Sequence, residues 1–346
     1  MQPSLILPGF AAEYALRQTN RHYNYRMSHN QVISKGEATM GSQQTTNQDS
    51  NDAIANTLPM GGRTMETLMP QQSGQPCPTC GSQARLSTNG SFTPSFVYAI
   101  GRIEPRFPSI GIEKELAQVI GRAETQGLTD RQALHDILQQ HRYLARELCW
   151  VFSIQGLETY ILQPRDPADF ALLVESLRRN PSPLDMDVVV GVRGPIAPPE
   201  MCNGLMVPIV VFDQLYSFDR NALLSAIPRP EGIAEDKFQP ASEEVLDRIT
   251  QISDNAGATD EHRALNYLAV RYPGVYALAA EQFDRNASLT AVEVRPSTLS
   301  GTRKIVDVIF AYTNRSTDVT DKFFVRVDVT ERFPFLVTRM SPYFDR

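Results

Sequence analysis

The chain of 346 residues lacks most of the features by which a sequence usually reveals its partner. Its 33 lysines and arginines are outnumbered by 39 aspartates and glutamates, and no basic stripe of the kind that neutralises phosphates is found. Its apolar runs stay well short of the roughly 20 residues that a membrane-spanning helix needs. We therefore expect neither nucleic acid nor a membrane as a partner.

Nothing at the first residues looks like a secretory signal, because Met1–Pro8 has no basic region and only a short apolar run. We therefore expect a cytoplasmic protein. Cytoplasmic thiols stay reduced, so the even number of cysteines, which is four, is not expected to mean disulfides.

No familiar catalytic frame is found in the sequence. It has no Gly-x-Ser-x-Gly elbow. The only glycine pair that resembles a phosphate loop, Gly191 and Gly194, lacks the lysine and the helix that should follow. Arg193, Glu200 and Asn203 are polar residues that could line a cleft, or could simply satisfy the backbone groups of their own loop.

A proline-rich connector, residues 193–204, lies between two strand-like apolar runs, Val188–Val192 and Met206–Phe212. Proline lacks a backbone N–H and fixes φ, so three prolines in five positions do not fit inside a central strand or a helix. We predict a rigid link between two buried strands. This link also carries one of the four cysteines, Cys202.

Two regions of different composition divide the chain. Residues 1–92 are predicted to be a mostly disordered arm, because stretches such as Gly41–Met60 are polar and bury too little apolar surface to offset the entropy of ordering. The arm carries a Cys-x-x-Cys knuckle. Residues 93–346 contain regular helix and strand patterns and are predicted to form the folded domain.

The folded domain is predicted to be α+β, an antiparallel sheet meander with packed helices. A hairpin is expected around Gln155–Glu158, helix starts at Thr129 and Asp166, and a strand over Met186–Val192 that is buried on both faces. Four alternating segments form the expected meander: Leu289–Val294, Lys304–Thr313, Lys322–Thr330 and Pro334–Arg339.

The cysteines are the strongest chemical signal. Cys77 and Cys80 are separated by two residues and followed by Gly81, a spacing that lets two thiolates hold one zinc ion. Cys149 and Cys202 each lie at the edge of a predicted strand and could complete the site. We predict a structural zinc ion bound by four thiolates, listed as Cys77, Cys80, Cys149 and Cys202. The alternatives are a redox pair in the knuckle and, for the two distant cysteines, small buried apolar side chains.

Several long segments resemble the C-terminal domain of unknown function in the PatA/PatG family of cyanobactin maturation proteases. They are Ser95–Glu104, Leu157–Asp166, Arg193–Gly204 and Asn255–Tyr267. In that family the domain follows a subtilisin-like protease domain, and it is associated with making macrocyclic peptides from a ribosomal precursor. The resemblance also implies zinc, which agrees with the four cysteines. The motifs of the subtilisin triad are missing, so the resemblance does not transfer protease or macrocyclase activity to this sequence.

We therefore expect a non-catalytic, zinc-binding accessory domain in cyanobactin biosynthesis. It would act by binding the precursor peptide, a pathway enzyme or a second copy of itself. Two alternatives stay open at this point: an enzyme with an unrecognised site that acts on the precursor, and a scaffold that works through dimerisation.

Overall fold

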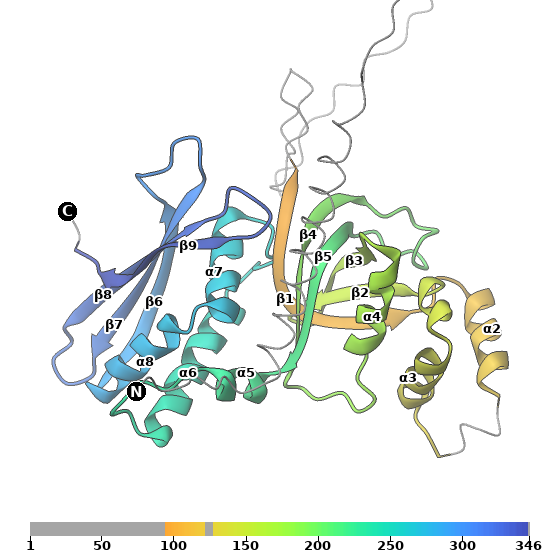
Figure 1. The fold of residues 1–346 in the computed structure, drawn as a ribbon, viewed down its shortest axis with the longest axis horizontal. Coiled ribbons are helices and arrows are strands. Elements are labelled where there is room, and N and C mark those ends of the chain that lie inside the picture. Colours follow the sequence, from red (N-terminus) through yellow and green to blue (C-terminus); the bar gives the residue numbers. More distant parts are fainter. Residues whose placement is uncertain (1–93, 122–126, 345–346) are drawn as a thin grey trace, which may run out of the picture. The chain divides into compact units, whose positions relative to one another are not determined.

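The structure is a computed structural model, and it describes residues 94–121 and 127–344. These residues lie in one compact unit, Thr93–Arg346 (Figure 1). The arm predicted for residues 1–92, with Cys77 and Cys80, falls outside the described residues. The predicted α+β class is confirmed, because the described chain combines two sheets with packed helices.

Five strands close into a barrel in the order β1-β2-β3-β5-β4. Neighbouring strands are antiparallel except for β3 and β5, which are parallel. The strands are β1 (Ser95–Arg106), β2 (Cys149–Ile154), β3 (Leu157–Pro164), β4 (Asp185–Ile196) and β5 (Pro208–Asp219).

Strand β1 belongs to both halves of the barrel wall. Its first residues, 95–101, pair with β4, and its last residues, 102–106, pair with β2. Gly101 lies where the pairing changes sides. A Cβ atom there would be 2.4 Å from the carbonyl oxygen of Ser153, so the close approach of β2 requires glycine.

Side chains alternate between the inside and the outside of the barrel. On β2, Trp150 and Phe152 point into the interior and join its core, whereas Val151 belongs to a separate cluster outside. The indole N–H of Trp150 donates to the carbonyl of Ala145 at 2.8 Å, so the buried ring leaves no unpaired donor.

Helices inserted between the strands pack against the core of the barrel. Between β1 and β2 lie α2 (Ile110–Ile120), α3 (Asp130–Gln140) and a 3-10 turn (Arg142–Arg146), and between β3 and β4 lie a 3-10 turn (Pro167–Asp169) and α4 (Phe170–Ser176). The two helix starts predicted from the sequence are confirmed. Thr129 and Gln132 form a capping box, and the side chain of Asp166 accepts from the amide of Ala168 with proline next in the chain.

A four-stranded antiparallel sheet with helices on one face follows the barrel, and it confirms the predicted meander (Figure 1). Its order is β6-β7-β8-β9. The elements are α5 (Arg220–Ala226), α6 (Glu235–Thr250), α7 (Asp260–Arg271), α8 (Gly274–Asp284), β6 (Ala287–Pro296), β7 (Ile305–Asn314), β8 (Thr320–Asp328) and β9 (Phe335–Pro342).

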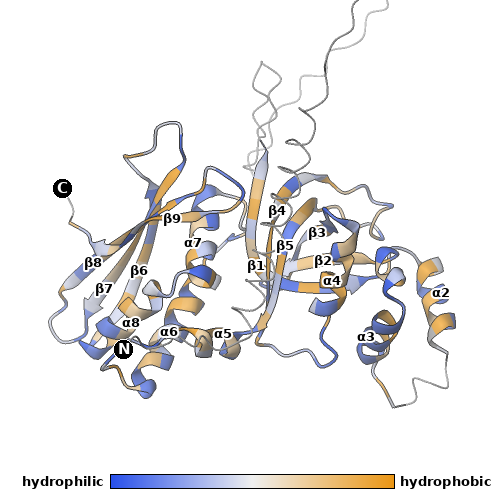
Figure 2. Ribbon diagram, in the orientation of Figure 1, coloured by the Kyte–Doolittle hydropathy of each residue, from blue (hydrophilic) through white to orange (hydrophobic). Residues whose placement is uncertain are grey.

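One apolar core joins the helices, the inner face of this sheet and the outer side of β1 and β4. Val308 and Phe310 of β7 belong to it, and so do Tyr98 and Val188 of the barrel. Hydrophobic colouring therefore runs along β1 and β4 and along the helices beside the second sheet (Figure 2). Within the described ranges, none of the helices is both long and apolar enough to span a bilayer.

Candidate functional site

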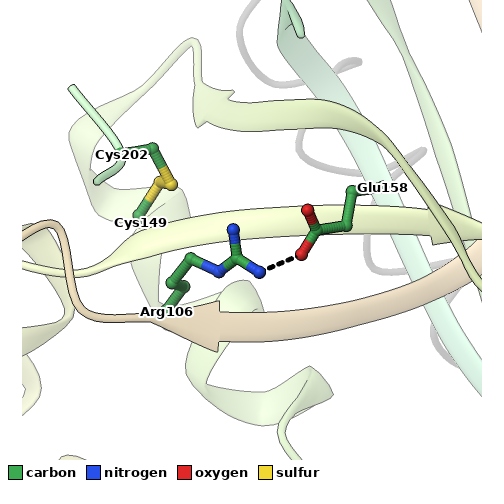
Figure 3. Close-up of a disulfide and its surroundings, with 4 residues drawn as sticks. All are labelled: Arg106, Cys149, Glu158 and Cys202. Atoms are coloured by element: carbon green, nitrogen blue, oxygen red, sulfur yellow. Dashed lines mark hydrogen bonds and ion pairs between the residues drawn. A yellow bond between two sulfur atoms is a disulfide. The ribbon is translucent and has the colours of Figure 1, made fainter. Parts of the chain in front are cut away.

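Cys149 and Cys202 are joined in a disulfide (Figure 3). Cys149 is the first residue of β2, and Cys202 lies in the connector between β4 and β5. Their Cα atoms are 5.7 Å apart, inside the range of roughly 4.4–6.8 Å that disulfides require. Both residues are buried. Closure of the barrel has thus brought together two cysteines that are 53 positions apart.

The expectation that the thiols stay reduced is therefore wrong for this pair. Neither sulfur is a thiolate in a disulfide, so in this oxidised form the pair is not a zinc ligand. Cys77 and Cys80 lie outside the described residues, and the zinc site with four cysteines stays a prediction. In residues 94–121 and 127–344, no group of three or more His, Cys, Asp or Glu is arranged to hold a metal ion.

Residues 197–207, which we call the lid, lie against the outer face of the barrel. They form an apolar cluster with that face, separate from the barrel interior. On the barrel side, Val151 of β2, Ile161 of β3 and Ile209 of β5 stand next to one another in the strand register. On the lid side the cluster contains Ala197, Met201, Cys202, Leu205 and Val207. The predicted rigid connector is therefore also a cover.

The backbone of the lid is bonded mainly to itself. Its two ends meet where the amide of Ala197 donates to the carbonyl of Val207 at 2.9 Å. Three further internal bonds run from Met201 to Pro198, from Gly204 to Pro199 and from Leu205 to Cys202. A short loop with joined ends and internal packing is a compact Ω-type loop, a class that is often functional.

An ion pair borders the covered face. Arg106, at the end of β1, is the register partner of Cys149, and its guanidinium contacts the carboxylate of Glu158 on β3 (Figure 3). The side chains of Arg106 and Glu158 are 41% and 36% exposed, so the pair contributes little stability. The outer surface of the barrel is thus apolar under the lid and charged beside it.

The polar residues of the connector do not converge on one point. Glu200 and Asn203 are exposed, and Asn203 has a φ of 46°, which suits the turn that it forms with Gly204. Arg193 lies on β4 instead, and its buried Nε has no hydrogen-bond partner among the described residues. Burial raises the pKa of Tyr160 to about 12, although the positive charge of Arg193 acts in the opposite direction.

A small polar pocket at the other end of β4 contains a buried carboxyl group that we did not predict. Asp187 is 5% exposed and accepts hydrogen bonds from the amide of Ile103 at 2.8 Å and from the hydroxyl of Ser217 at 2.5 Å. Burial raises its pKa to about 6, although both hydrogen bonds act in the opposite direction. The signal in the sequence was an acid directly before the run Val188–Val190, within the strand predicted to be buried on both faces.

The outer face of the second sheet carries arginines stacked on aromatic rings. Guanidinium carbons lie 4.7–5.3 Å from ring centroids in three pairs, Arg326 with Phe324, Arg295 with Tyr343 and Arg303 with Phe335. Arg295, Asp307 and Arg326 also face one another across three strands in the register. We call this surface the arginine–aromatic face. The alternation of residues along β8 predicted that one face of this strand would be polar. It did not predict that charged side chains of β6, β7 and β8 would face one another on that side of the sheet.

Comparison with known proteins gives two findings. A family model described as PatG C-terminal matches residues 233–343, which contain the whole second sheet and helices α6, α7 and α8. A solved structure described as the PatG domain of unknown function matches with a TM-score of 0.60 and 21% sequence identity, over 72% of this chain and 98% of that chain. A search of curated proteins found no match.

The resemblance noted in the sequence is supported over residues 233–343, which include one of the segments that carried it, Asn255–Tyr267. At 21% identity the solved structure establishes the fold and nothing finer. Residues 233–343 match the PatG C-terminal family model, and the described chain has the fold of the PatG domain of unknown function.

Proposed function

We propose that this chain is a non-catalytic accessory domain of cyanobactin biosynthesis that binds the precursor peptide. The PatG C-terminal match supports a place in that pathway. Partner enzymes of the pathway and a second copy of the chain are the other binding partners that the resemblance suggests. In each case the domain would hold a partner in position while another protein carries out the chemistry.

The arginine–aromatic face is the observation that carries a binding role. Aromatic residues and arginine are enriched where proteins contact one another, because they supply large contact areas and fixed hydrogen-bond donors. Phe335 is 46% exposed and Val337 is 36% exposed on β9, and the side chain of Arg303 is 52% exposed beside them. Arg303 and Arg326 are ion-paired with Asp328 and Asp307, so this face offers apolar side chains and guanidinium planes, rather than unpaired positive charge, to an aromatic peptide.

Binding can be measured by the fluorescence anisotropy of a labelled cyanobactin precursor peptide titrated with the full chain. We expect the double variant Phe335→Ser, Val337→Ser to weaken binding at least tenfold. Leu157→Ser is the matched control, because Leu157 is 73% exposed on the barrel and far from β9 in the chain. Circular dichroism would verify that both variants fold. Equal affinity in the double variant and the control would refute binding by this face.

One observation favours the alternative that the chain is an enzyme. A buried carboxyl with a raised pKa, as in Asp187, is typical of proton-transfer sites. The mass of the precursor peptide after incubation with this protein alone separates the two functions. An unchanged mass agrees with the accessory role. A shifted mass that disappears with Asp187→Asn would make the chain an enzyme.

We also propose that the reduced chain holds a structural zinc ion through Cys77, Cys80, Cys149 and Cys202. The support is the 5.7 Å between the Cα atoms of Cys149 and Cys202, which lets two thiolates reach one tetrahedral ion. Zinc binding would add to the free energy of folding. Protein purified under reducing conditions should contain one zinc ion per chain by elemental analysis. Cys77→Ser and Cys202→Ser should each lose zinc and melt at a lower temperature, and unchanged metal content in both variants contradicts the site.

A further inference from the structure

The strand order of the barrel gives a reason to examine its outer face. Five strands ordered β1-β2-β3-β5-β4, with a helix between β3 and β4, have the topology of the OB barrel. Barrels of that topology bind ligands on the outer face of strands two and three, between the loops that follow strands one and four. The likeness to OB barrels is one of fold alone. In this chain, the loop after β4 is the lid, and it lies on that face.

The lid covers the outer face of β2 and β3 without backbone hydrogen bonds to these strands. In the part of the chain that the structure describes, no hydrogen bond joins residues 198–206 to β2 or β3. The contacts that remain are apolar packing by half-buried side chains such as Met201 and Leu205, and the covalent bond from Cys202 to Cys149. Only this packing and the disulfide hold the lid, and with it the internal bonds of its backbone, in place on the barrel.

We propose that residues 197–207 are a redox-controlled lid, which the Cys149–Cys202 bond holds over the outer face of β2, β3 and β5 and which reduction by a dithiol releases. One thiolate of the dithiol attacks the bond, forms a mixed disulfide with one cysteine and displaces the other as a thiolate. The second thiol of the dithiol then displaces the remaining cysteine and closes its own disulfide. Two electrons and two protons pass to the protein.

Release of the lid would uncover three apolar side chains that the closed barrel hides. Val151 is 2% exposed and Ile161 is 1% exposed beneath the lid, and Ile209 packs beside them. Since Cys149 and Cys202 are themselves almost fully buried, a reductant reaches the bond only when the lid opens locally. Packing of the lid therefore sets the rate of reduction, and the bond sets the open or closed state.

Hydrogen exchange followed by mass spectrometry tests this proposal on the full chain. The oxidised chain is compared with the chain reduced by dithiothreitol, with a chelator present so that zinc cannot hold the thiols. We expect amides of residues 200–206 to exchange at least tenfold faster after reduction, while helix α7 stays unchanged. The double variant Cys149→Ala, Cys202→Ala should show the fast exchange without reductant, and Met206→Ser, altered at a residue that is 61% exposed, should not.

Two results would overturn the proposal. One is equal protection of residues 200–206 in the oxidised and reduced chains. The other is an oxidised preparation in which alkylation and intact mass show that all four cysteines are free thiols. Neither result depends on peptide binding, and the chelator is present in both experiments to remove zinc from the thiols, so failure of the lid is distinguishable from failure of the proposed function.

Discussion

The guanidinium of Arg263 stacks on the ring of Phe96, with 5.2 Å between the guanidinium carbon and the ring centroid. Arg263 belongs to α7 and Phe96 to β1, so this contact joins the helical layer to the barrel. Arg263 is only 2% exposed, and it also donates to the carbonyl oxygens of Val329 and Glu331 beyond β8. One side chain therefore ties three parts of the fold together.

Replacement of Arg263 by alanine should destabilise the chain by about 3 kcal/mol, because it leaves buried carbonyl groups without donors and removes the stacking on Phe96. Urea unfolding followed by circular dichroism measures this loss. Arg285→Ala, at an exposed position after α8, should change the free energy of unfolding by less than about 0.5 kcal/mol. Similar losses in both variants would show that Arg263 is not a structural link.

Alanine substitutions at Gly257 and Gly232 distinguish the cost of backbone strain from the cost of close packing. Both have a positive φ, +67° and +85°. A Cβ on Gly257 would lie 2.3 Å from the carbonyl oxygen of Tyr98, whereas a Cβ on Gly232 would meet nothing within 4 Å. We expect Gly232→Ala to cost about 1 kcal/mol from strain alone, and Gly257→Ala about 3 kcal/mol or more. Equal unfolding free energies in the two variants would contradict this packing.

The buried carboxyl of Asp187 predicts a pH dependence of stability. Its pKa in the folded chain is about 6, above the ordinary value near 4. Between these two values the folded state binds more protons than the unfolded state. The free energy of unfolding should therefore fall by roughly 2–3 kcal/mol as the pH rises from about 4 to about 6, and this contribution should stay flat above.

Urea titrations at several pH values measure this slope. Asp187→Asn should flatten it, since asparagine does not ionise, whatever the substitution does to stability at one pH. Asp236→Asn, at an exposed position in the first turn of α6, should keep the slope of the parent chain. A parent slope that survives in Asp187→Asn would assign the effect to another group.

The disulfide should stabilise the oxidised chain mainly by restricting the unfolded state. A sequence separation of 53 residues corresponds to about 4 kcal/mol in the chain-entropy model, an upper figure because engineered and natural bonds often give less. We expect the double variant Cys149→Ala, Cys202→Ala to lose about 2–4 kcal/mol relative to the oxidised parent. The reduced, metal-free parent should unfold at nearly the same urea concentration as this variant. A reduced parent as stable as the oxidised one would contradict the expectation.

Packing of the lid should control how fast the disulfide is reduced. Leu205 packs in the cluster under the lid, whereas Met206 beside it is 61% exposed. Leu205→Ala should speed reduction by dithiothreitol about tenfold, because local opening becomes easier by roughly 1.4 kcal/mol, and Met206→Ala should leave the rate unchanged. The appearance of free thiols against time gives both rates. Equal rates would mean that the reductant reaches the bond without opening of the lid.

Local patterns predicted most of the elements. The hairpin around Gln155–Glu158 and the four strands of the meander follow from turn residues and alternation, and the structure has them. The connector was predicted to begin at Arg193, which is too early, because β4 continues through Ile196 and includes Pro195. The strand accommodates this proline where the pairing with β5 is irregular, between Arg193 and Ile196, so no ladder bond needs its missing N–H.

Closure of the barrel was not predictable in this way. The parallel pairing of Ile161 with Ile209 joins residues almost 50 positions apart, and period-2 alternation says nothing about which strands become neighbours. The same limit applies to the cysteines. Cys149 and Cys202 were predicted to share a zinc site, and the structure brings them together as a disulfide, because oxidation state is not encoded in spacing.

The position of β1 has a consequence for biosynthesis of the chain. This strand is the first of the described elements to leave the ribosome, yet its partner β4 starts only at Asp185. Asn266, whose side chain donates to the carbonyl of Tyr98, is synthesised later still. The apolar residues among 95–101 must therefore wait for more than 80 residues of chain before β4 pairs with them, whereas residues 102–106 need only β2. The meander of β6–β9, in contrast, is built from neighbours and can form quickly once synthesised. A chaperone that recognises exposed strands would find β1 its most persistent target in this nascent chain.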